Sequence, residues 1–480
     1  MRFSALVGLI LLAALLAGHD PVRAESPAHE SVRGVLAFRG GSTRTRYGVG
    51  PVPRKPRVVW KRWLGSRDGW AGTGWTGQPA VVEWPKPLAA AMFPGGPPRA
   101  EVIVGGLCGS VFFFDGDRGT DSRPPLRLPG PGSIKGSVTV DPDGFPLLYV
   151  GNRGGRYCLV SLLGAPRVVA TIDGRVDPRS GTPTDCWPDF DGSGLVVGGD
   201  LLVGGENCWF YRIPLQRSAE HPVPPRKQWK TVYTPTVSGL AREALDLSNS
   251  YASLESSPTV FGDRVYVAAG NGMVLGFHRK TLGLEFQYHT GDDTDATVVV
   301  DSKGFLYVAC QSDYHPRRQG ILFKLNPAVP PHRWKEARVW SRSFAAYPDK
   351  GGPGHQDNLD AGFHGTPALG PGPDGTPQAR LYACVTLRPG RQGRVMALDT
   401  RTGKTIWERD CTCQIWASPV LVDGKLLVAE GSGVLRCLRA SDGKELWHVQ
   451  LGGVLESTPV VWRGWIYVGA RDGRFYALHD

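Results

Sequence analysis

Two neighbouring stretches decide the fold: ASPVLVDGKLLVAEGSGVLRCLRASDGKELW, residues 417–447, and STPVVWRGWIYVGARDGRFYAL, residues 457–478. Their first strands begin forty residues apart, at Pro419 and Pro459. Each stretch contains short runs of branched and aromatic residues separated by Gly-rich turns. A repeat of about forty residues with this content is typical of a β-propeller blade, which buries its apolar faces only by stacking against neighbouring blades.

Each repeat indicates four strands joined by tight turns. Asp-Gly pairs such as Asp423-Gly424 suit hairpins because they tolerate positive φ. Further towards the N-terminus, comparable strand starts bring the number of repeats to eight. These starts are Pro79, Ser137, Gly194, Pro258, Thr297, Pro367, Pro419 and Pro459. The sequence therefore predicts an all-β fold, an eight-bladed β-propeller of four-stranded antiparallel blades.

The last blade lacks a fourth strand of its own, because the chain ends at Asp480 after the third. Residues 56–63, PRVVWKRW, have the pattern of a fourth strand but no blade before them. We expect Val58–Lys61 to complete the last blade and close the ring, which removes an open sheet edge. The expected propeller covers residues 57–480, with an N-terminal lead-in segment at 25–56.

The first 24 residues predict a secretory signal peptide. A positive start is followed by the apolar run Ala5–Ala17, which is too short to span a bilayer. Val22-Arg23-Ala24 fits cleavage before Glu25. Because no later stretch is apolar enough to span a membrane, we expect an exported protein, periplasmic or extracellular, without a membrane span.

Composition excludes several classes of protein. The chain has 64 Gly and 40 Pro in 480 residues, which argues against a bundle of long helices. The net charge is +11, but Lys and Arg are scattered and form no basic run. We therefore expect no nucleic-acid partner, and we expect a monomer.

The repeats resemble those of the PQQ-like β-propeller family. The resemblance rests on GKTIW at 403–407, on GKELW at 443–447 and on the two stretches quoted above. The segment AFRGGSTRTRYGVGPVP, residues 37–53, resembles the lead-in segment of the same family. The resemblance covers the chain from about Arg39 onwards and is most regular after residue 250. It is specific for the fold and a poor guide to activity.

The resemblance implies a range of functions. Members of the family include quinoprotein dehydrogenases, periplasmic scaffold proteins of outer-membrane assembly and secreted proteins of unassigned activity. The dehydrogenases use PQQ against an adjacent pair of cysteines, together with Ca²⁺ held by carboxylate and amide side chains. This chain has no adjacent cysteines. We therefore expect no cofactor, with PQQ and Ca²⁺ as the alternative.

One mouth of the central channel is the expected site. In a propeller, the loops from the fourth strand to the next first strand share that face with the loops between the second and third strands. The residues three positions before each strand start should form a ring there. They are Thr76, Ile134, Asp191, Glu255, Thr294, His364, Trp416 and Glu456.

The polar and aromatic members of this ring, which excludes Ile134, are candidate ligand-binding residues. Carboxylates held close together attract a cation and raise one another's pKa. The alternative is that each carboxylate caps a neighbouring loop or binds water. Asp292, Asp293 and Asp295 lie in another loop of the same face. No spacing is diagnostic of a metal site or of a catalytic residue.

Nine cysteines follow the expected cleavage point, so at least one is unpaired. Export permits disulfides. Cys186 and Cys208 both fall on loops of the mouth face, and we predict that they pair. Cys158 and Cys437 fall inside third strands and are expected to be buried thiols.

The hypothesis that follows is an exported, non-catalytic propeller. It would bind a protein or glycan of the cell envelope through its mouth loops. One alternative is a PQQ-dependent quinoprotein dehydrogenase. The other is a glycan-acting enzyme that uses mouth residues such as Glu255, His364 and Glu456.

Overall fold

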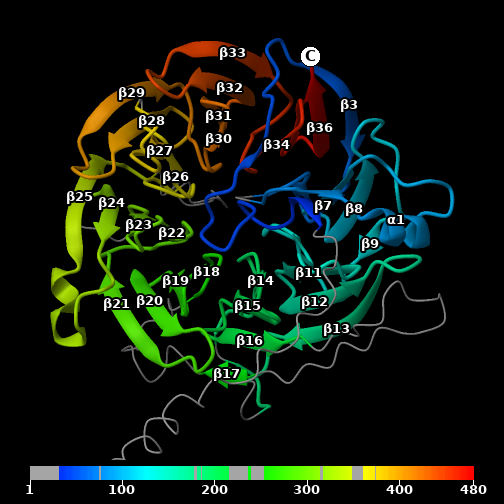
Figure 1. The fold of residues 1–480 in the computed structure, drawn as a ribbon, viewed down its shortest axis with the longest axis horizontal. Helices are drawn as coiled ribbons and strands as arrows, with labels where there is room; N and C mark the ends of the chain where they lie inside the picture. The colour runs from blue at the N-terminus through cyan, green and yellow to red at the C-terminus, as the bar shows by residue number, and fades with distance from the viewer. Residues whose placement is uncertain are drawn as a thin grey trace, which may run out of the picture.

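The computed structural model describes residues 32–480 apart from 75–76, 178–180, 185, 216–235, 239–252, 314–316, 349–359 and 373. Within these ranges, strands form eight sheets arranged as the blades of a ring, together with one short two-stranded hairpin (Figure 1). The predicted eight-bladed all-β propeller is confirmed. The expected signal peptide, residues 1–24, lies outside the described residues.

The blades follow one another along the chain, each with its first strand innermost. The first blade contains β1 (Arg33–Val35), β6 (Ala80–Glu83), β7 (Glu101–Gly105), β8 (Ser110–Asp115) and β9 (Leu126–Arg127), and the second contains β10 (Thr139–Val140), β11 (Leu147–Asn152), β12 (Arg156–Ser161) and β13 (Arg167–Asp173). The third blade contains β14 (Leu195–Val197), β15 (Asp200–Gly204), β16 (Phe210–Pro214) and β17 (Thr236–Ser238). The fourth contains β18 (Thr259–Phe261), β19 (Arg264–Ala268), β20 (Met273–His278) and β21 (Leu284–His289). The fifth blade contains β22 (Val299–Val300), β23 (Leu306–Cys310), β24 (Gln319–Leu325) and β25 (Arg338–Ala345), and the sixth contains β26 (Ala368–Gly370), β27 (Arg380–Arg388), β28 (Gln392–Asp399) and β29 (Thr405–Cys411). The seventh blade contains β30 (Val420–Val422), β31 (Lys425–Ala429), β32 (Val434–Arg439) and β33 (Glu445–Gln450). The eighth contains β2 (Gly48–Val49), β34 (Val460–Trp462), β35 (Trp465–Gly469), β36 (Arg474–His479) and β3 (Arg57–Trp63). The hairpin is β4 (Ser66–Arg67) with β5 (Trp70–Ala71), and the helices are α1 (Lys86–Met92) and a 3₁₀ helix, Pro331–Glu336.

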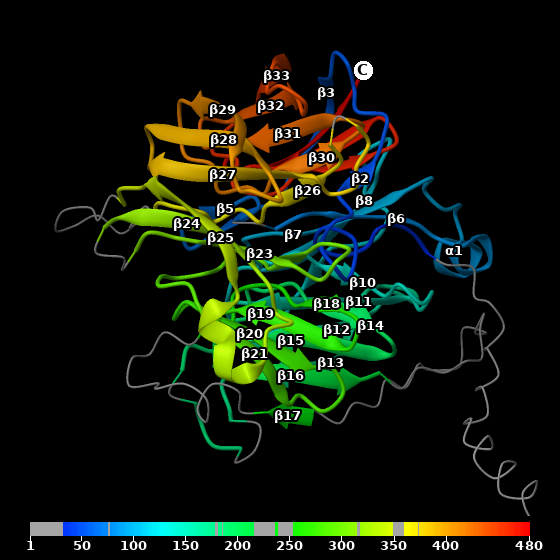
Figure 2. The ribbon, with the colours of Figure 1, turned by 60° about the vertical axis from the view of Figure 1, so that its left-hand side comes forward.

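Strand β3 closes the ring, as the sequence predicts. It runs antiparallel to β36, with Trp60 opposite Ala477 and Lys61 opposite Tyr476. The two strands lie side by side in both views (Figures 1 and 2). The last blade therefore has no unpaired edge on β36.

Burial follows the position of a strand within its blade. The second and third strands are covered on both faces by neighbouring blades; every residue of β11 is buried. The fourth strand β33 alternates between half-buried and exposed residues. This difference explains why inner strands are runs of apolar residues, whereas the outer GKELW segment mixes charged and apolar ones.

Tryptophans on the fourth strands join neighbouring blades. The indole Nε1 of Trp60 donates to the carbonyl of Gly116 over 2.9 Å, and that of Trp407 donates to the carbonyl of Ala440 over 2.9 Å. Each ring also packs on a turn glycine of the next blade: Trp60 on Gly119, and Trp407 on Gly443. The glycine of one repeat therefore contacts the tryptophan of the repeat before it.

The lead-in segment is built into the ring. Strand β1 pairs with β6 on the inside of the first blade, and β2 pairs in parallel with β34 of the last. Between these strands the chain crosses the channel, as the blue segment shows in Figure 1. The backbone N–H of Val140 donates to the carbonyl of Leu36, and that of Val260 donates to Ser42, each over 2.7 Å. The segment therefore obstructs the channel.

In the part of the chain that the structure describes, no helix has the length and apolar character needed to cross a bilayer.

Candidate functional site at the channel mouth

A belt of hydrogen bonds lies just before the first strand of each four-stranded repeat, which is β6, β10, β14, β18, β22, β26, β30 or β34. Seven backbone N–H groups each donate to a side-chain hydroxyl of the next blade, over 2.6–3.1 Å. The last link runs from the N–H of Thr458 to the carbonyl of Gly77, over 3.2 Å. The belt residues are Gln78, Ser137, Ser193, Ser257, Thr297, Thr366, Ser418 and Thr458. Because these bonds join equivalent positions, they establish how the eight blades align.

The residues two positions before the belt form what we call the mouth ring. Its described members are Lys135, Asp191, Glu255, Asp295, His364, Trp416 and Glu456. Thr76, the predicted member from the first blade, lies outside the described residues. Between ring and belt stands a small residue in every blade. At Gly136 a Cβ atom would lie 2.3 Å from the Asp191 carbonyl oxygen, so the backbones of neighbouring blades approach closely there.

In the fifth blade the ring position falls one residue later than the sequence predicts. The prediction equates Thr297 with the prolines of other blades, whereas the belt equates it with the hydroxyl residue before each proline. Asp295 therefore takes the place expected for Thr294. The hydroxyl of Thr294 instead donates to the carbonyl of Asp292, over 3.0 Å, within its own loop.

The second blade shows the same shift. Its belt residue is Ser137, which the prediction treats as the equivalent of a proline. The ring position is Lys135, while the expected Ile134 is buried with an exposed fraction of 1%. The one-residue shift in alignment therefore gives the second blade a cationic ring residue, Lys135, where the sequence predicts the apolar Ile134.

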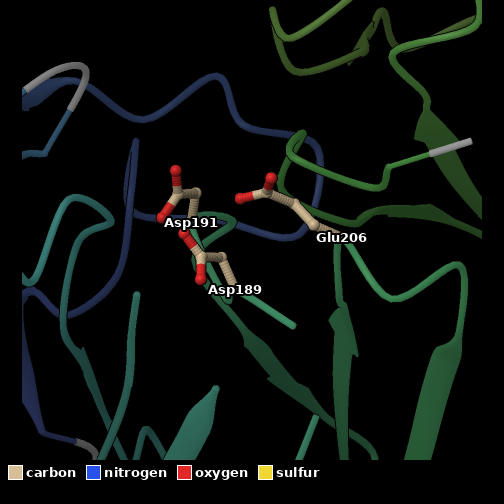
Figure 3. A group of neighbouring side chains, drawn as sticks. All are labelled: Asp189, Asp191 and Glu206. Carbon is tan, nitrogen blue, oxygen red and sulfur yellow. The ribbon is translucent and has the colours of Figure 1, made fainter. Parts of the chain in front are cut away.

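Six carboxylates gather on the side of the mouth formed by the third, fourth and fifth blades, and we call them the acidic cluster. Asp189, Asp191 and Glu206 each place a carboxylate oxygen within 4.8 Å of those of the other two (Figure 3). The first two lie in the loop before β14, and Glu206 lies between β15 and β16. The full cluster is Asp189, Asp191, Glu206, Glu255, Asp293 and Asp295.

Two cations partly neutralise this cluster. Lys135 forms an ion pair with Asp191, and the Nε of Arg153 lies 2.9 Å from Asp189. Burial lowers the pKa of Lys135, but the carboxylates of Asp191 and Glu255 raise it by more, so this lysine stays charged. Six carboxylates against two cations leave the cluster short of positive charge.

This shortage of positive charge and the burial of the cluster raise the pKa values of several of its carboxyl groups, so that they retain their protons to higher pH. Burial raises the pKa of Glu206 well above its usual range, and the charges of Glu255 and Asp191 raise it further. The pKa values of Asp293 and Asp295 are raised in the same way, by burial first and then by their acidic neighbours. Burial also raises the pKa of Glu255 to about 7, although Lys135 opposes the shift.

Two buried oxygens of the cluster, Asp191 Oδ1 and Glu206 Oε1, have no hydrogen-bond partner among the described residues. The carboxyls of Asp293 and Asp295 hydrogen-bond to each other. A buried acceptor without a partner costs about 1–3 kcal/mol. A group that donates hydrogen bonds or carries positive charge would recover this energy.

Aromatic rings and further ion pairs line the rest of the mouth. The rings of His364 and Trp416 stack with their centres 4.9 Å apart. Burial lowers the pKa of His364 to about 3, so the imidazole is neutral at physiological pH. Arg471 lies over Trp70 at 4.7 Å and 3.4 Å from the carboxylate of Glu456. The mouth therefore has an acidic side and an aromatic side.

Two arginines of the lead-in segment reach the belt from within the channel. Arg39 and Arg44 are both 0% exposed. Arg44 donates through Nε to the carbonyl of Pro258 over 2.9 Å, and Arg39 donates to that of Pro419 over 3.4 Å. Burial lowers the pKa of Arg44 to about 9. Each arginine thus donates to a carbonyl at the level of the belt, while Arg39 Nε has no partner among the described residues. The two buried side chains form the floor of the mouth, and we call the mouth with this floor the cup.

The predicted cysteine pair lies beside the acidic cluster. The sulfurs of Cys186 and Cys208 are 3.2 Å apart, which is hydrogen-bond contact and not a covalent bond. The predicted disulfide therefore stays a prediction. Cys158 and Cys437 are both buried in third strands.

Sequence reasoning missed Lys135, Asp189 and Glu206 as mouth residues. A signal for Glu206 was available, because it precedes Cys208 by two residues in a turn that the sequence places on the mouth face. Lys135 would follow from aligning the repeats on the small residue and the hydroxyl residue that come before each proline. Asp189 has no such signal, since its place depends on the course of an irregular loop.

Comparison with known proteins gives sequence matches to part of the chain. The family model described as outer membrane protein assembly factor BamB matches residues 391–480. A quinoprotein ethanol dehydrogenase of Pseudomonas putida is 33% identical over 84 residues, which are 17% of this chain and 14% of that protein. The chain is an eight-bladed β-propeller whose repeats at residues 391–480 are of the PQQ-like type. The assembly factor BamB of Marinobacter adhaerens is 30% identical to this propeller over 106 residues, which are 22% of this chain and 27% of that protein.

The matches thus cover less than a third of the length of either curated relative. Among solved structures, the quinohemoprotein alcohol dehydrogenase of Comamonas testosteroni aligns with a TM-score of 0.60 and 13% identity. That alignment covers 95% of this chain and 81% of the dehydrogenase chain. At this level of identity the likeness supports the fold alone.

The mouth does not fit PQQ, the cofactor of quinoprotein dehydrogenases. PQQ carries three carboxylates, and the two cations of the cluster, Lys135 and Arg153, are already paired with Asp191 and Asp189, which leaves little positive charge to hold them. The buried arginines below donate to backbone carbonyls, and no two cysteines are adjacent in the chain. The donor set instead suits a group that carries positive charge.

Proposed function

We propose that this propeller is an exported binding module without a catalytic role. It would hold a protein of the cell envelope at its channel mouth. The observation that carries the proposal is the cup itself: a floor formed by Arg39 and Arg44 lies below carboxylates of which two buried oxygens lack partners among the described residues. Similarity to the assembly factor BamB supports a scaffold role in the envelope.

The charge of the cup specifies the chemistry of the partner. Glu206 is 8% exposed, and its Oε1 has no hydrogen-bond donor among the described residues. A lysine or arginine side chain of the partner would supply donors and positive charge at once, which favours both affinity and specificity. The proposed partner therefore presents a basic side chain to the acidic cluster.

Capture of envelope proteins tests this proposal. Tagged wild-type propeller is compared with E206Q, which keeps the shape of the side chain but cannot lose a proton to become a carboxylate when a cation of the partner approaches. The matched control is E285Q, the same chemical change at the Arg264 ion pair on the outer strand β21. We expect E206Q to lose at least about fivefold of the captured partner, equivalent to about 1 kcal/mol, and E285Q to retain it. Equal capture by the two variants would contradict a role for the mouth.

Export has its own test. Sequencing the N-terminus of protein purified from the envelope fraction should give Glu25 as the first residue. An intact Met1 in the purified protein would overturn the proposed signal peptide.

A glycan-acting enzyme is the second candidate, and Glu255 is the residue that favours it. A carboxyl whose pKa is about 7 keeps its proton near neutral pH, as the general acid of a glycosidase must. Release of reducing ends from envelope polysaccharide, lost in E255Q, would support this candidate. No release between pH 5 and 8 would remove it.

A further inference from the structure

A second site lies on the opposite face of the ring, between the fifth and sixth blades. A cavity of about 760 Å³ opens there. Its walls are the turn after β22, the loop between β26 and β27 and the turn after β28. These connections belong to the face away from the channel mouth. This volume is within the range of small-molecule sites in proteins.

Hydrogen bonds between the two blades hold the walls in place. The N–H of Ser302 donates to Gln378 Oε1 over 2.7 Å, and the Thr400 hydroxyl donates to the Gln378 carbonyl over 2.9 Å. The carbonyl of Thr400 accepts from Lys324 Nζ and from Trp340 Nε1, each over 3.0 Å. The cavity is therefore a fixed feature of the joint between the blades.

The carboxylates of the wall are already engaged by their own turns. Asp301 accepts from the backbone N–H groups of Lys303 and Phe305, over 2.9 and 3.0 Å. Asp399 accepts from the N–H and the hydroxyl of Thr402, each over 2.8 Å. Asp374 accepts likewise from the N–H and hydroxyl of Thr376. These acids shape the turns.

The cations of the wall interact electrostatically with these acids but form no ion pair with them: Lys324 with Asp301 and Asp399, Arg380 with Asp374, and Arg401 with Asp399. Lys303, Lys324, Arg380 and Arg401 all line the cavity. Within the described ranges of the chain, none of the four takes part in an ion pair. The ammonium group of Lys324 lies 4.3 Å from the ring centre of Phe305. Burial lowers the pKa of this lysine, so an anion close to it would stabilise its charged form.

We propose that this cavity binds a small organic anion. Its phosphate or carboxylate group would lie among Lys303, Lys324, Arg380 and Arg401, and its apolar body would lie against Phe305. Both groups are oxyanions and accept the same donors. The site is independent of the proposed function, because it shares no residue with the channel mouth.

The next joint provides an internal comparison. A similar groove of about 540 Å³ lies between the sixth and seventh blades. Arg380 is the one basic side chain that lines it, and Asp423 lines it as well. A groove thus occurs at both of these joints, and of the two only the one between the fifth and sixth blades is lined by four cations.

Calorimetric titration of the full-length protein with phenyl phosphate and with benzoate tests the proposal. Benzyl alcohol serves as the neutral probe. The variants are K303Q and R401Q, both at exposed turn positions where folding should be unaffected. The matched control is K444Q, which removes an exposed cation from the corresponding turn of the seventh blade.

We expect at least one of the two anions to bind with Kd in the millimolar range or tighter, and benzyl alcohol not to bind. Each single variant should lose about threefold in affinity and the double variant about tenfold, while K444Q binds as the wild type does. Preference for one anion would identify the phosphate or the carboxylate as the recognised group. Failure of both anions to bind, or undiminished binding by the double variant, would overturn the proposal.

Discussion

Replacing Trp60 with Ala tests whether strand β3 closes the ring. The indole is half-buried in the joint between the last and first blades. Its ring centre lies 5.8 Å from that of Phe114 and 6.0 Å from that of Phe475. Its Nε1 donates to the carbonyl of Gly116 over 2.9 Å. The substitution removes these contacts and leaves the backbone pairing of β3 in place.

The expected loss is about 2–4 kcal/mol. Truncation of a fully buried aromatic residue to Ala costs about 3–5 kcal/mol, and the partial exposure of Trp60 reduces this. The hydrogen bond adds little, because the Gly116 carbonyl also accepts from the Tyr467 hydroxyl over 3.2 Å and so keeps a partner.

Urea unfolding followed by circular dichroism measures the effect. With a slope of about 3 kcal/mol/M, a loss of 3 kcal/mol lowers the midpoint by about 1 M. The control is V59A in the same strand, because Val59 is 48% exposed and should cost less than about 0.5 kcal/mol. If the midpoints of W60A and V59A coincide, the indole does not hold the joint and the account of closure is wrong.

Three further results are expected. G443A should be at least about 1 kcal/mol less stable than G424A. Both glycines have positive φ, but only at Gly443 would the new Cβ meet an indole, at 2.6 Å. Equal urea midpoints of the two variants would contradict this. Because the pKa of Glu255 is raised to about 7, the folded state binds the proton more tightly than the unfolded state does, so stability should fall as pH rises from about 4.5 to 7. In melting curves measured by calorimetry across this pH range, E255Q should show a smaller fall in stability. An equal fall in E255Q would assign the pH dependence to other groups. Oxidation should link Cys186 to Cys208 by a disulfide and stabilise the fold by about 2–4 kcal/mol. A peptide map of the oxidised protein should contain the cross-linked peptide, and C208S should lack it. Absence of this peptide from the oxidised wild type would refute the pairing.

Much of the fold is predictable because the repeat is local. Spacings such as that from Pro419 to Pro459 specify the blade, and the unpaired pattern around Trp60 specifies the closing strand. The course of the lead-in segment is not predictable in this way. Its place in the channel depends on long-range bonds, such as that from Arg44 to Pro258, which no local pattern encodes.

The site is harder to predict than the fold because it requires single-residue alignment of divergent repeats. Where a proline is present, as at Pro258, the sequence places the ring residue Glu255 correctly in the alignment that the belt defines. Where Val replaces the proline, as in the fifth blade, the alignment slips and Thr294 is taken for Asp295.

The pairing of Arg57–Trp63 with Arg474–His479 also constrains how the molecule is made. Contacts between segments more than four hundred residues apart in sequence are slow to form. During synthesis, β36 is made long after its partner β3. Until then the first blade has no neighbouring blade on one of its two faces. We infer that the completed circle is an all-or-none event late in folding, and that a chain cut short by only a few residues would stay open.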